Sequence, residues 1–358
     1  MSRMRYGVAR SLFVLSGIAG SLTVMAMPAL AGPPATPQAA YRTVMVVPLG
    51  APDRWDYLHY DAASGRVYVS HGSEVTVVDG QTGKIIGSIT GMPGGTHGIA
   101  ISHATGQGFT DDGRAGEAVA FNLKTLKVTK RIKAEPDADG IVYDPSSRHV
   151  FVIDGDSGAL TVVDPRTDEV VATVHVGAPL EFGVSGHNGK LYVNGVRDHD
   201  IVRIDTRTNT VDAHWAMPGC EHPRGLAIDR QHHRLFSTCA NGRMVVLNAA
   251  SGAVVARLPI DKGSDAARFD PRLHFALSSN FSGTLSVIRE DSPDKYTVLS
   301  TVKTEMSART LGLDAKTGRI FLLAADIKVN PAASPKDYRH RYQVTPNSLK
   351  LYMLDPTR

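Results

Sequence analysis

Cysteine is scarce in this sequence, whose 358 residues include only two, Cys220 and Cys239. Neither belongs to a Cys-x-x-Cys-His motif, which excludes covalently attached c-type haem. The sequence also lacks a phosphate-binding loop, a dinucleotide glycine motif and a G-x-S-x-G elbow in a suitable setting. We therefore expect no nucleotide cofactor and no hydrolase of the nucleophile-elbow class.

Excess charge is small once the N-terminal segment is set aside. The whole chain carries 39 Lys and Arg against 35 Asp and Glu, a formal net charge of +4. Three of the basic residues, Arg3, Arg5 and Arg10, lie in the first 31 residues, which leaves 36 basic against 35 acidic residues, or about +1. Nonspecific binding to nucleic acid depends on a diffuse basic field. A nucleic-acid partner is therefore not expected.

Long apolar runs are absent from the sequence except at residues 11–27. Arginines precede this run and Pro28-Ala29-Leu30-Ala31 follows it, which is the order of a secretory signal with an A-x-A cleavage site. A membrane anchor is the alternative, but the run contains Ser and Gly and is short for a span. The absence of a nearby cysteine argues against a lipoprotein. We expect Met1–Ala31 to be cleaved after Sec-type export, leaving a periplasmic or secreted chain without a transmembrane segment.

What the sequence does contain is short runs of Val and Ile separated by turn residues. The clearest example is Asp139–Val174, whose four apolar runs are Ile141–Tyr143, Val150–Ile153, Leu160–Val163 and Val170–Val174. The intervening segments are rich in Asp, Pro, Ser and Gly, which close turns. This alternation predicts a four-stranded antiparallel meander.

The meander occurs seven times, at the spacing of roughly forty residues that is typical of propeller blades. Each copy opens with an ionisable residue, here called the anchor, followed by four mostly apolar positions. The seven anchors are Asp56, His97, Asp139, Glu181, Arg224, Asp265 and Arg309. One meander cannot bury both faces of its sheet, so the copies must stack around an axis. We predict an all-β, seven-bladed propeller over residues 41–358, preceded by a Pro-rich linker at residues 32–40.

The two ends of the repeat predict how the ring closes. The last copy stops after its third strand, Leu349–Asp355, whereas Arg42–Pro48 is a strand pattern that precedes the first copy. The N-terminal strand should therefore complete the last blade as its outermost strand.

Several strands carry a motif that resembles a known family. Val67-Tyr68-Val69-Ser70 and Leu191-Tyr192-Val193-Asn194 resemble the YVTN repeats of bacterial seven-bladed propellers, of which the periplasmic YncE-like proteins are the nearest class. The resemblance covers nearly all of residues 41–358. It implies the propeller fold and varied binding roles, including affinity for single-stranded DNA, for which this chain lacks the basic excess. More distant lactonase-like and metal-dependent lyase propellers share the architecture.

The anchors should form a ring at one mouth of the central channel, because each opens an innermost strand. Asp56, His97, Asp139 and Glu181 come from four consecutive blades and could bind a divalent cation, which would be calcium, magnesium or manganese. Arg224 and Arg309 flank Asp265 and could hold an anionic group. The alternatives are a ring of acids and arginines that neutralise one another, and a ligand site without metal.

Two further features are predicted for the same face of the ring. Cys220 precedes the inner strand of the fifth blade and Cys239 ends its second strand, so an oxidising compartment should join them in a disulfide. The last blade contains a long basic insertion, Asp326–Ser348, which we interpret either as a lid or as a flexible loop.

These patterns favour an exported, monomeric propeller that binds a small polar or anionic ligand at the channel mouth, with or without a divalent cation. One alternative is a metal-assisted hydrolase or lyase at the same site. The other is a scaffold that binds a periplasmic protein partner and has no small-molecule site.

Overall fold

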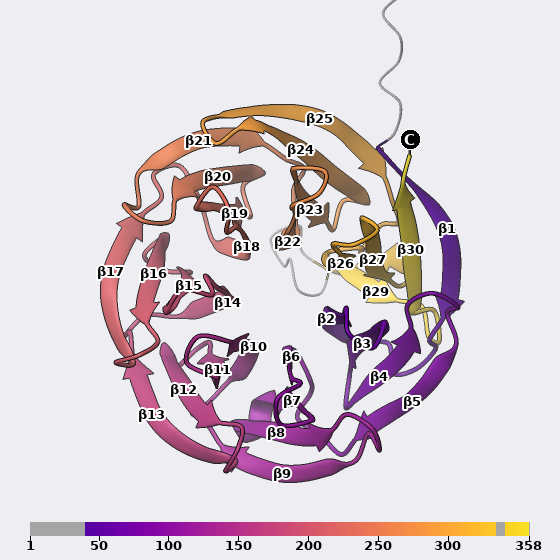
Figure 1. The fold of residues 1–358 in the computed structure, drawn as a ribbon. Helices are drawn as coiled ribbons and strands as arrows, with labels where there is room; N and C mark the ends of the chain where they lie inside the picture. Colours follow the sequence, from indigo (N-terminus) through magenta and orange to yellow (C-terminus); the bar gives the residue numbers. More distant parts are fainter. Residues whose placement is uncertain (1–39, 334–340, 358) are drawn as a thin grey trace, which may run out of the picture. The chain divides into compact units, whose positions relative to one another are not determined.

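Antiparallel four-stranded sheets account for most of residues 40–333 and 341–357, which are the part of the chain that this computed structural model describes. In Figure 1 the seven sheets surround a central axis, and the first strand of each full meander lies innermost. Blades 1 and 2 comprise β2 (Trp55–Asp61), β3 (Arg66–His71), β4 (Glu74–Asp79), β5 (Ile85–Thr90), β6 (Ile99–Ser102), β7 (Gln107–Asp112), β8 (Glu117–Asn122) and β9 (Val128–Lys133). Blades 3 and 4 comprise β10 (Ala138–Asp144), β11 (His149–Asp154), β12 (Ala159–Asp164), β13 (Glu169–His175), β14 (Leu180–Ser185), β15 (Lys190–Gly195), β16 (Asp200–Asp205) and β17 (Thr210–Ala216).

Blades 5 and 6 continue the same order, and blade 7 combines both ends of the described chain. Blades 5 and 6 comprise β18 (Pro223–Asp229), β19 (Arg234–Cys239), β20 (Arg243–Asn248), β21 (Val254–Pro259), β22 (Ser264–Asp270), β23 (Phe275–Asn280), β24 (Thr284–Ser292) and β25 (Lys295–Lys303). Blade 7 comprises β26 (Thr310–Asp314), β27 (Arg319–Ala324), β30 (Lys350–Pro356) and β1 (Tyr41–Pro48). The predicted seven-bladed propeller is thus confirmed.

Closure of the ring by the N-terminal strand is also confirmed. β1 pairs antiparallel with β30, from Tyr41 opposite Pro356 to Pro48 opposite Lys350. Figure 1 shows the indigo β1 lying outside the yellow-green β30. The pairing covers the outer edge of β30, which would otherwise expose unpaired backbone groups.

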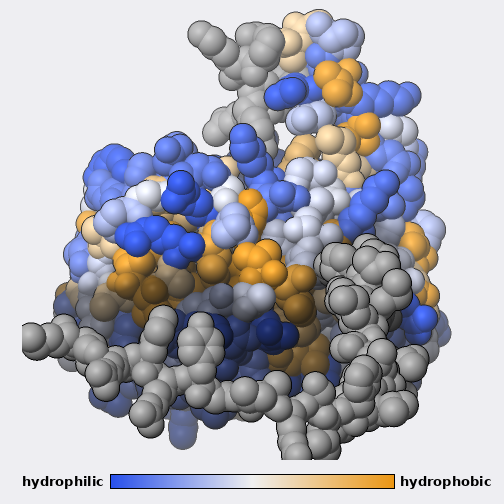
Figure 2. All heavy atoms as spheres, turned by 90° about the horizontal axis from the view of Figure 1, so that it is seen from above, coloured by the Kyte–Doolittle hydropathy of each residue, from blue (hydrophilic) through white to orange (hydrophobic). Residues whose placement is uncertain are grey.

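The core lies between blades rather than at the centre of the ring. Each of its seven apolar clusters draws on two neighbouring blades; in one of them, Phe151 and Val162 of blade 3 pack with Leu191 and Val202 of blade 4. This arrangement explains the apolar alternation of the strands, since both faces of the three inner strands of a blade are covered by its neighbours. The outermost strands are less covered and leave Val46, Val171 and Val298 exposed. Figure 2 looks onto one side of the ring, where apolar side chains gather near the middle and hydrophilic ones surround them.

The predicted disulfide between Cys220 and Cys239 is present. It links the segment before β18 to the end of β19, and both cysteines are buried in the cluster between blades 4 and 5. A disulfide is typical of proteins that fold in oxidising compartments.

The insertion in blade 7 contains more structure than the sequence indicated. Its flanks form a short hairpin of β28 (Ile327–Val329) and β29 (Tyr342–Val344), and the Tyr342 ring lies 5.0 Å from that of Phe281 in blade 6. The carboxylate of Asp53 accepts hydrogen bonds from the backbone N–H groups of Asn347 and Ser348. The middle of the insertion, residues 334–340, lies outside the described residues, and the lid remains a prediction.

The predicted signal segment, Met1–Ala31, also lies outside the described residues, as does most of the linker at 32–40. In the part of the chain that is described, no helix is long and apolar enough to cross a membrane.

Candidate functional site

The seven anchors lie at or just before the start of the innermost strands, and neighbouring anchors contact one another. Asp56, Asp139, Glu181, Arg224 and Asp265 belong to β2, β10, β14, β18 and β22, while His97 and Arg309 precede β6 and β26. All seven side chains are partly exposed rather than buried in the blades. They differ in what they contact, and this divides them into two arcs.

The first arc consists of arginines paired with acids. Arg224 lies 2.8 Å from Glu181, and Arg309 lies 3.2 Å from Asp265. Glu181 also accepts a hydrogen bond of 3.2 Å from the Tyr57 hydroxyl. Burial raises the pKa of Glu181 to about 7, although Arg224 acts to lower it. On this arc the arrangement is the mutual neutralisation that the sequence allowed as an alternative.

The second arc consists of Asp56, His97 and Asp139, which are not neutralised in this way. Each of these side chains offers one potential metal-ligand atom, and the three atoms all lie within 4.8 Å of one another. Among the described residues, the only arginine that forms an ion pair with a carboxylate of this arc is Arg309, which lies 3.9 Å from Asp56. Burial, together with the charges of Glu181 and Asp56, raises the pKa of Asp139 well above its usual range. Two carboxylates held this close favour a bound cation.

The backbone explains why His97 and Asp139 meet. The N–H of Gly98 donates a hydrogen bond of 2.8 Å to the carbonyl oxygen of Asp139, which ties the entry of β6 to β10. A Cβ atom on Gly98 would lie 2.4 Å from the backbone nitrogen of Ile141. Only glycine therefore allows blades 2 and 3 to approach this closely at the ring.

The orientation of the His97 ring is set by Asp111, whose carboxylate is fully buried at the end of β7. One oxygen of Asp111 lies 2.6 Å from Nδ1 of His97, and the other accepts the backbone N–H groups of His97 and Gly98. Nδ1 therefore donates, which leaves Nε2 to face the other groups of the arc. Burial alone would lower the pKa of His97, but the hydrogen bond and charge of Asp111, with Asp56 and Asp139, raise it to about 9.

The Arg54 guanidinium lies beside this arc. Its Nη2 is 3.4 Å from Nε2 of His97, and Arg54 is exposed. This contact requires Nε2 to act as an acceptor, whereas the neighbouring carboxylates favour the imidazolium form. The contact is long and therefore weak, so the protonation state of His97 is determined by the carboxylates around its ring.

Two of these residues were not identified as site residues from the sequence. Asp111 is one of several Asp and Asn residues near the ends of second strands, where such residues usually form turns, and Arg54 lies outside the repeated pattern. The strand register does provide a signal for Asp111, because the equivalent second-strand residues of the other blades are uncharged: Ser70, Ile153, Asn194, Thr238, Ser279 and Leu323. No comparable signal marks Arg54, which lies in a loop.

Below the ring, three side chains narrow the central channel. The rings of Tyr57 and Phe182 lie 4.7 Å apart, and the Arg268 guanidinium lies 5.1 Å from the Phe182 ring centroid. The inner strands beyond them line a cavity of about 340 Å³, which His187 and Arg230 border at its far end. Phe182 thus packs within the channel, and Trp55 packs in the cluster between blades 7 and 1.

The sequence is weakly similar to that of known proteins. No protein-family model matches the sequence. The chain is 23% identical over 184 residues to the uncharacterised protein YncE of Salmonella typhi and of Salmonella typhimurium. The matched region is 49% of this chain and 51% of each relative, so the match spans about half the length of these relatives.

A solved structure supports the fold over a larger part of the chain. Kuenenia stuttgartiensis hydrazine synthase is similar with a TM-score of 0.67, covering 84% of this chain and 96% of the matched chain, at 13% identity. Identity at this level shows the fold alone. The chain is therefore a seven-bladed β-propeller that is similar to YncE over about half of its length, and its disulfide and its similarity to YncE are consistent with an exported protein.

Proposed function

We propose that this chain is an exported propeller that binds one divalent cation and, with it, a small anionic ligand at the anchor ring. The observation that carries the proposal is the arc of Asp56, His97 and Asp139, whose potential ligand atoms lie within 4.8 Å of one another. The Asp111–His97 hydrogen bond supports it, because histidines that bind metals commonly donate their second ring N–H to a carboxylate.

The donor set favours a transition cation over the two alkaline-earth ions that the sequence also allowed. One imidazole and two carboxylates suit manganese or a similar metal, whereas calcium and magnesium prefer oxygen ligands alone. Transition metals bind such donors at about 2.0–2.2 Å, so adjacent donors of one ion are about 3–3.5 Å apart. The three side chains would therefore move closer together on binding.

The anionic ligand would bind on the solvent side of the cation. Three protein donors leave coordination positions open, and Arg54 lies at the edge of the arc with an exposed guanidinium. Arg224, whose side chain is 39% exposed, is already paired with Glu181 but lies on the same ring. A carboxylate or phosphate bound to the cation could then accept hydrogen bonds from arginine.

Metal analysis of untagged purified protein after dialysis against Mn²⁺ tests the cation. We expect about one equivalent of metal per chain and a higher melting temperature in its presence. Asp139→Asn and His97→Gln should each lose the equivalent held by the anchor ring, while Glu181→Gln should keep it because Arg224 and Tyr57 engage that carboxylate. If the wild-type protein retains no metal and gains no melting temperature, the cation site is wrong.

Anion binding is tested separately by thermal shift with small carboxylates and inorganic phosphate. We expect stabilisation only when Mn²⁺ is present, and weaker stabilisation in Arg54→Gln. An anion effect that is equal without metal would support the ligand site but contradict a role for the cation.

A further inference from the structure

A second group of potential metal ligands lies at the other end of the channel strands. His232 is in the turn between β18 and β19, His274 is in the turn between β22 and β23, and Glu290 is near the end of β24. The anchors precede the first strands, whereas these two turns follow them, so the group lies on the opposite face of the ring. It spans blades 5 and 6. It does not include any residue of the anchor ring and does not depend on a cation or ligand there.

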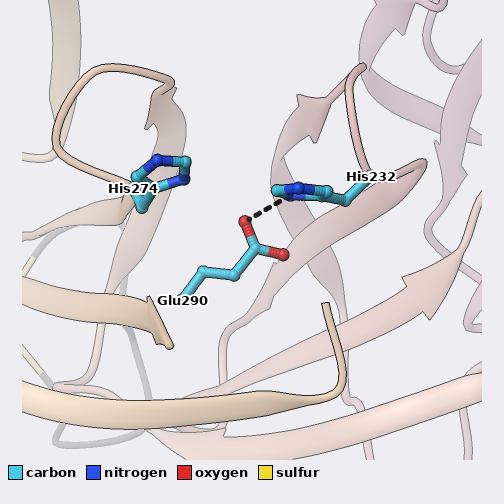
Figure 3. A group of neighbouring side chains, drawn as sticks. All are labelled: His232, His274 and Glu290. Carbon is cyan, nitrogen blue, oxygen red and sulfur yellow. Dashed lines mark ion pairs between the residues drawn. The ribbon is translucent and has the colours of Figure 1, made fainter. Parts of the chain in front are cut away.

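The three side chains converge on one point. Each offers a potential ligand atom, and these atoms lie within 4.8 Å of one another. Figure 3 shows the Glu290 carboxylate directed towards His232, with His274 on the other side of it. The Glu290 side chain is only 1% exposed, whereas His274 is exposed and borders solvent. The group is therefore buried at its carboxylate and open at one imidazole.

Buried polar atoms in this group lack the hydrogen bonds that such atoms normally form. Nδ1 of His232 lies 2.7 Å from Oδ2 of Asp229 and 3.5 Å from Oε2 of Glu290. Both contacts are ion pairs when His232 is protonated, but none of the three atoms has a hydrogen-bond partner among the described residues. Leaving such atoms unsatisfied is costly, and two buried carboxylates beside one ring call for positive charge.

The backbone at His274 adds an independent observation. Its φ is 55°, and the equivalent turn position is glycine in four other blades: Gly65, Gly106, Gly189 and Gly318, all with positive φ. A non-glycine residue in this conformation costs about 1 kcal/mol or more. His274 thus carries a side chain at a turn position where the backbone conformation favours glycine.

Blade 6 also departs from its neighbours where it supplies Glu290. β24 and β25 have nine residues each, whereas β20 and β21 of blade 5 have six. In blade 5, Asn248 ends the third strand and its side chain accepts hydrogen bonds from the N–H groups of the following turn. In blade 6 Arg289 occupies this position, the strand continues past it, and the next residue, Glu290, is buried.

We propose that His232, His274 and Glu290 bind a zinc ion that links blades 5 and 6, with Asp229 near enough to supply a fourth ligand atom. Two imidazoles and a carboxylate are a donor set that zinc and similar transition metals take readily, and that calcium and magnesium do not. The ion would satisfy the buried atoms of His232 and Glu290 and connect two turns that come from different blades. Its role is structural, because it would join two turns from different blades next to the ion pair between Arg234 of blade 5 and Asp294 of blade 6.

The experiment uses untagged protein carrying His97→Gln, so that the anchor ring does not contribute. Equilibrium dialysis against Zn²⁺ should give one zinc ion per chain, and the melting temperature should rise by several degrees in excess zinc. Cobalt in place of zinc should give visible absorption bands of a low-symmetry site. His274→Gly should lose the zinc equivalent, the thermal shift and the cobalt bands. Because glycine suits this φ, the metal-free variant should melt no lower than its parent.

His233→Gly is the matched control. His233 has the same φ of 55° in the equivalent turn of blade 5 but is not a member of the group. It should keep the zinc equivalent and the thermal shift, whereas Glu290→Gln should lose both. The proposal is overturned if the parent protein binds no zinc, if His274→Gly binds as much zinc as the parent, or if His233→Gly loses it equally.

Discussion

The carboxylates of this protein differ in what surrounds them, and their surroundings determine whether they are candidates for binding a cation. Asp139 and Glu290 each have a carboxylate with few hydrogen-bond donors nearby, which makes them candidates for binding a cation. Asp144 is fully buried and accepts four hydrogen bonds. A carboxylate so surrounded is stable as an anion without any metal.

The contacts of Asp144 predict an effect of pH on stability. Its carboxylate at the end of β10 accepts hydrogen bonds from Ser147 in the following turn and from Ser185 and Thr206 of blade 4. Burial alone would raise the pKa of Asp144, but these hydrogen bonds lower it below its ordinary value of 3.8. A lowered pKa means that the contribution to stability is complete above the ordinary value and is lost as the pH falls through the folded-state pKa.

We therefore expect Asp144→Asn to lower the free energy of unfolding by about 1–3 kcal/mol at neutral pH. The difference from wild type should shrink in acid, because the wild-type carboxylate is then protonated as well. Urea unfolding at neutral pH and below pH 3 measures both values. Asp156→Asn, at an exposed aspartate of the same blade, serves as the control and should have little effect at either pH. A difference that stays constant with pH would contradict the assignment.

At the scale of the elements, the disulfide ties the segment that enters β18 to the end of β19 at the anchor face. Cys220 and Cys239 are 19 residues apart, and joining them restricts the unfolded chain by about 3 kcal/mol in the chain-entropy model. We expect the double variant Cys220→Ala with Cys239→Ala to unfold at a correspondingly lower urea concentration. Wild-type protein in strong reductant should unfold close to the variant. Identical midpoints for the oxidised protein and the variant would show that the bond does not contribute to stability.

The elements were the part of the structure most open to prediction from the sequence. The blades repeat one pattern of apolar runs and turn residues, so the order of strands and the role of β1 follow from counting copies. The hairpin of β28 and β29 was not predicted, because strands of three residues beside several prolines have too little apolar pattern to be recognised.

The site was less predictable for a physical reason. The sequence places seven ionisable residues at equivalent backbone positions, but which of them pair depends on the reach of each side chain across a blade boundary. Arg309 reaches Asp265 in blade 6, and Arg224 reaches Glu181 in blade 4, so both arginines contact the preceding blade. His97 instead turns towards Asp111 of its own blade. These pairings leave Asp56 and Asp139 beside the imidazole of His97. The repeat pattern of the sequence does not indicate which anchors pair.

At the scale of the whole molecule, ring closure depends on a strand that is distant in sequence from its partner. β1 is the outer strand of blade 7 and contacts only β30 within the sheet, as Figure 1 shows. Tyr41 packs in the cluster between blades 6 and 7, and Val47 packs in the cluster between blades 7 and 1. One strand thus contributes to the cores on both sides of the closing blade.

Removing this strand should weaken the whole ring rather than one blade. Burial of Tyr41 and Val47 contributes about 3–6 kcal/mol at the usual value per large apolar side chain, and a folded domain has a total stability of about 5–15 kcal/mol. We expect a chain that begins at Leu49 to unfold at a much lower urea concentration and to self-associate, because β30 then becomes an exposed edge.

A chain that begins at Ala40 is the matched control for this truncation. It keeps β1 and the hydrogen bond from the N–H of Thr357 to the carbonyl oxygen of Ala40, so its unfolding midpoint should equal that of the longer chain. Size-exclusion chromatography and urea unfolding of the two truncated chains give the comparison. If the chain that begins at Leu49 stays monomeric and keeps the midpoint of the control, the three strands β26, β27 and β30 suffice to close the ring. A separately added peptide of residues 41–48 should restore stability to the shorter chain, because the missing strand is then available to pair with β30.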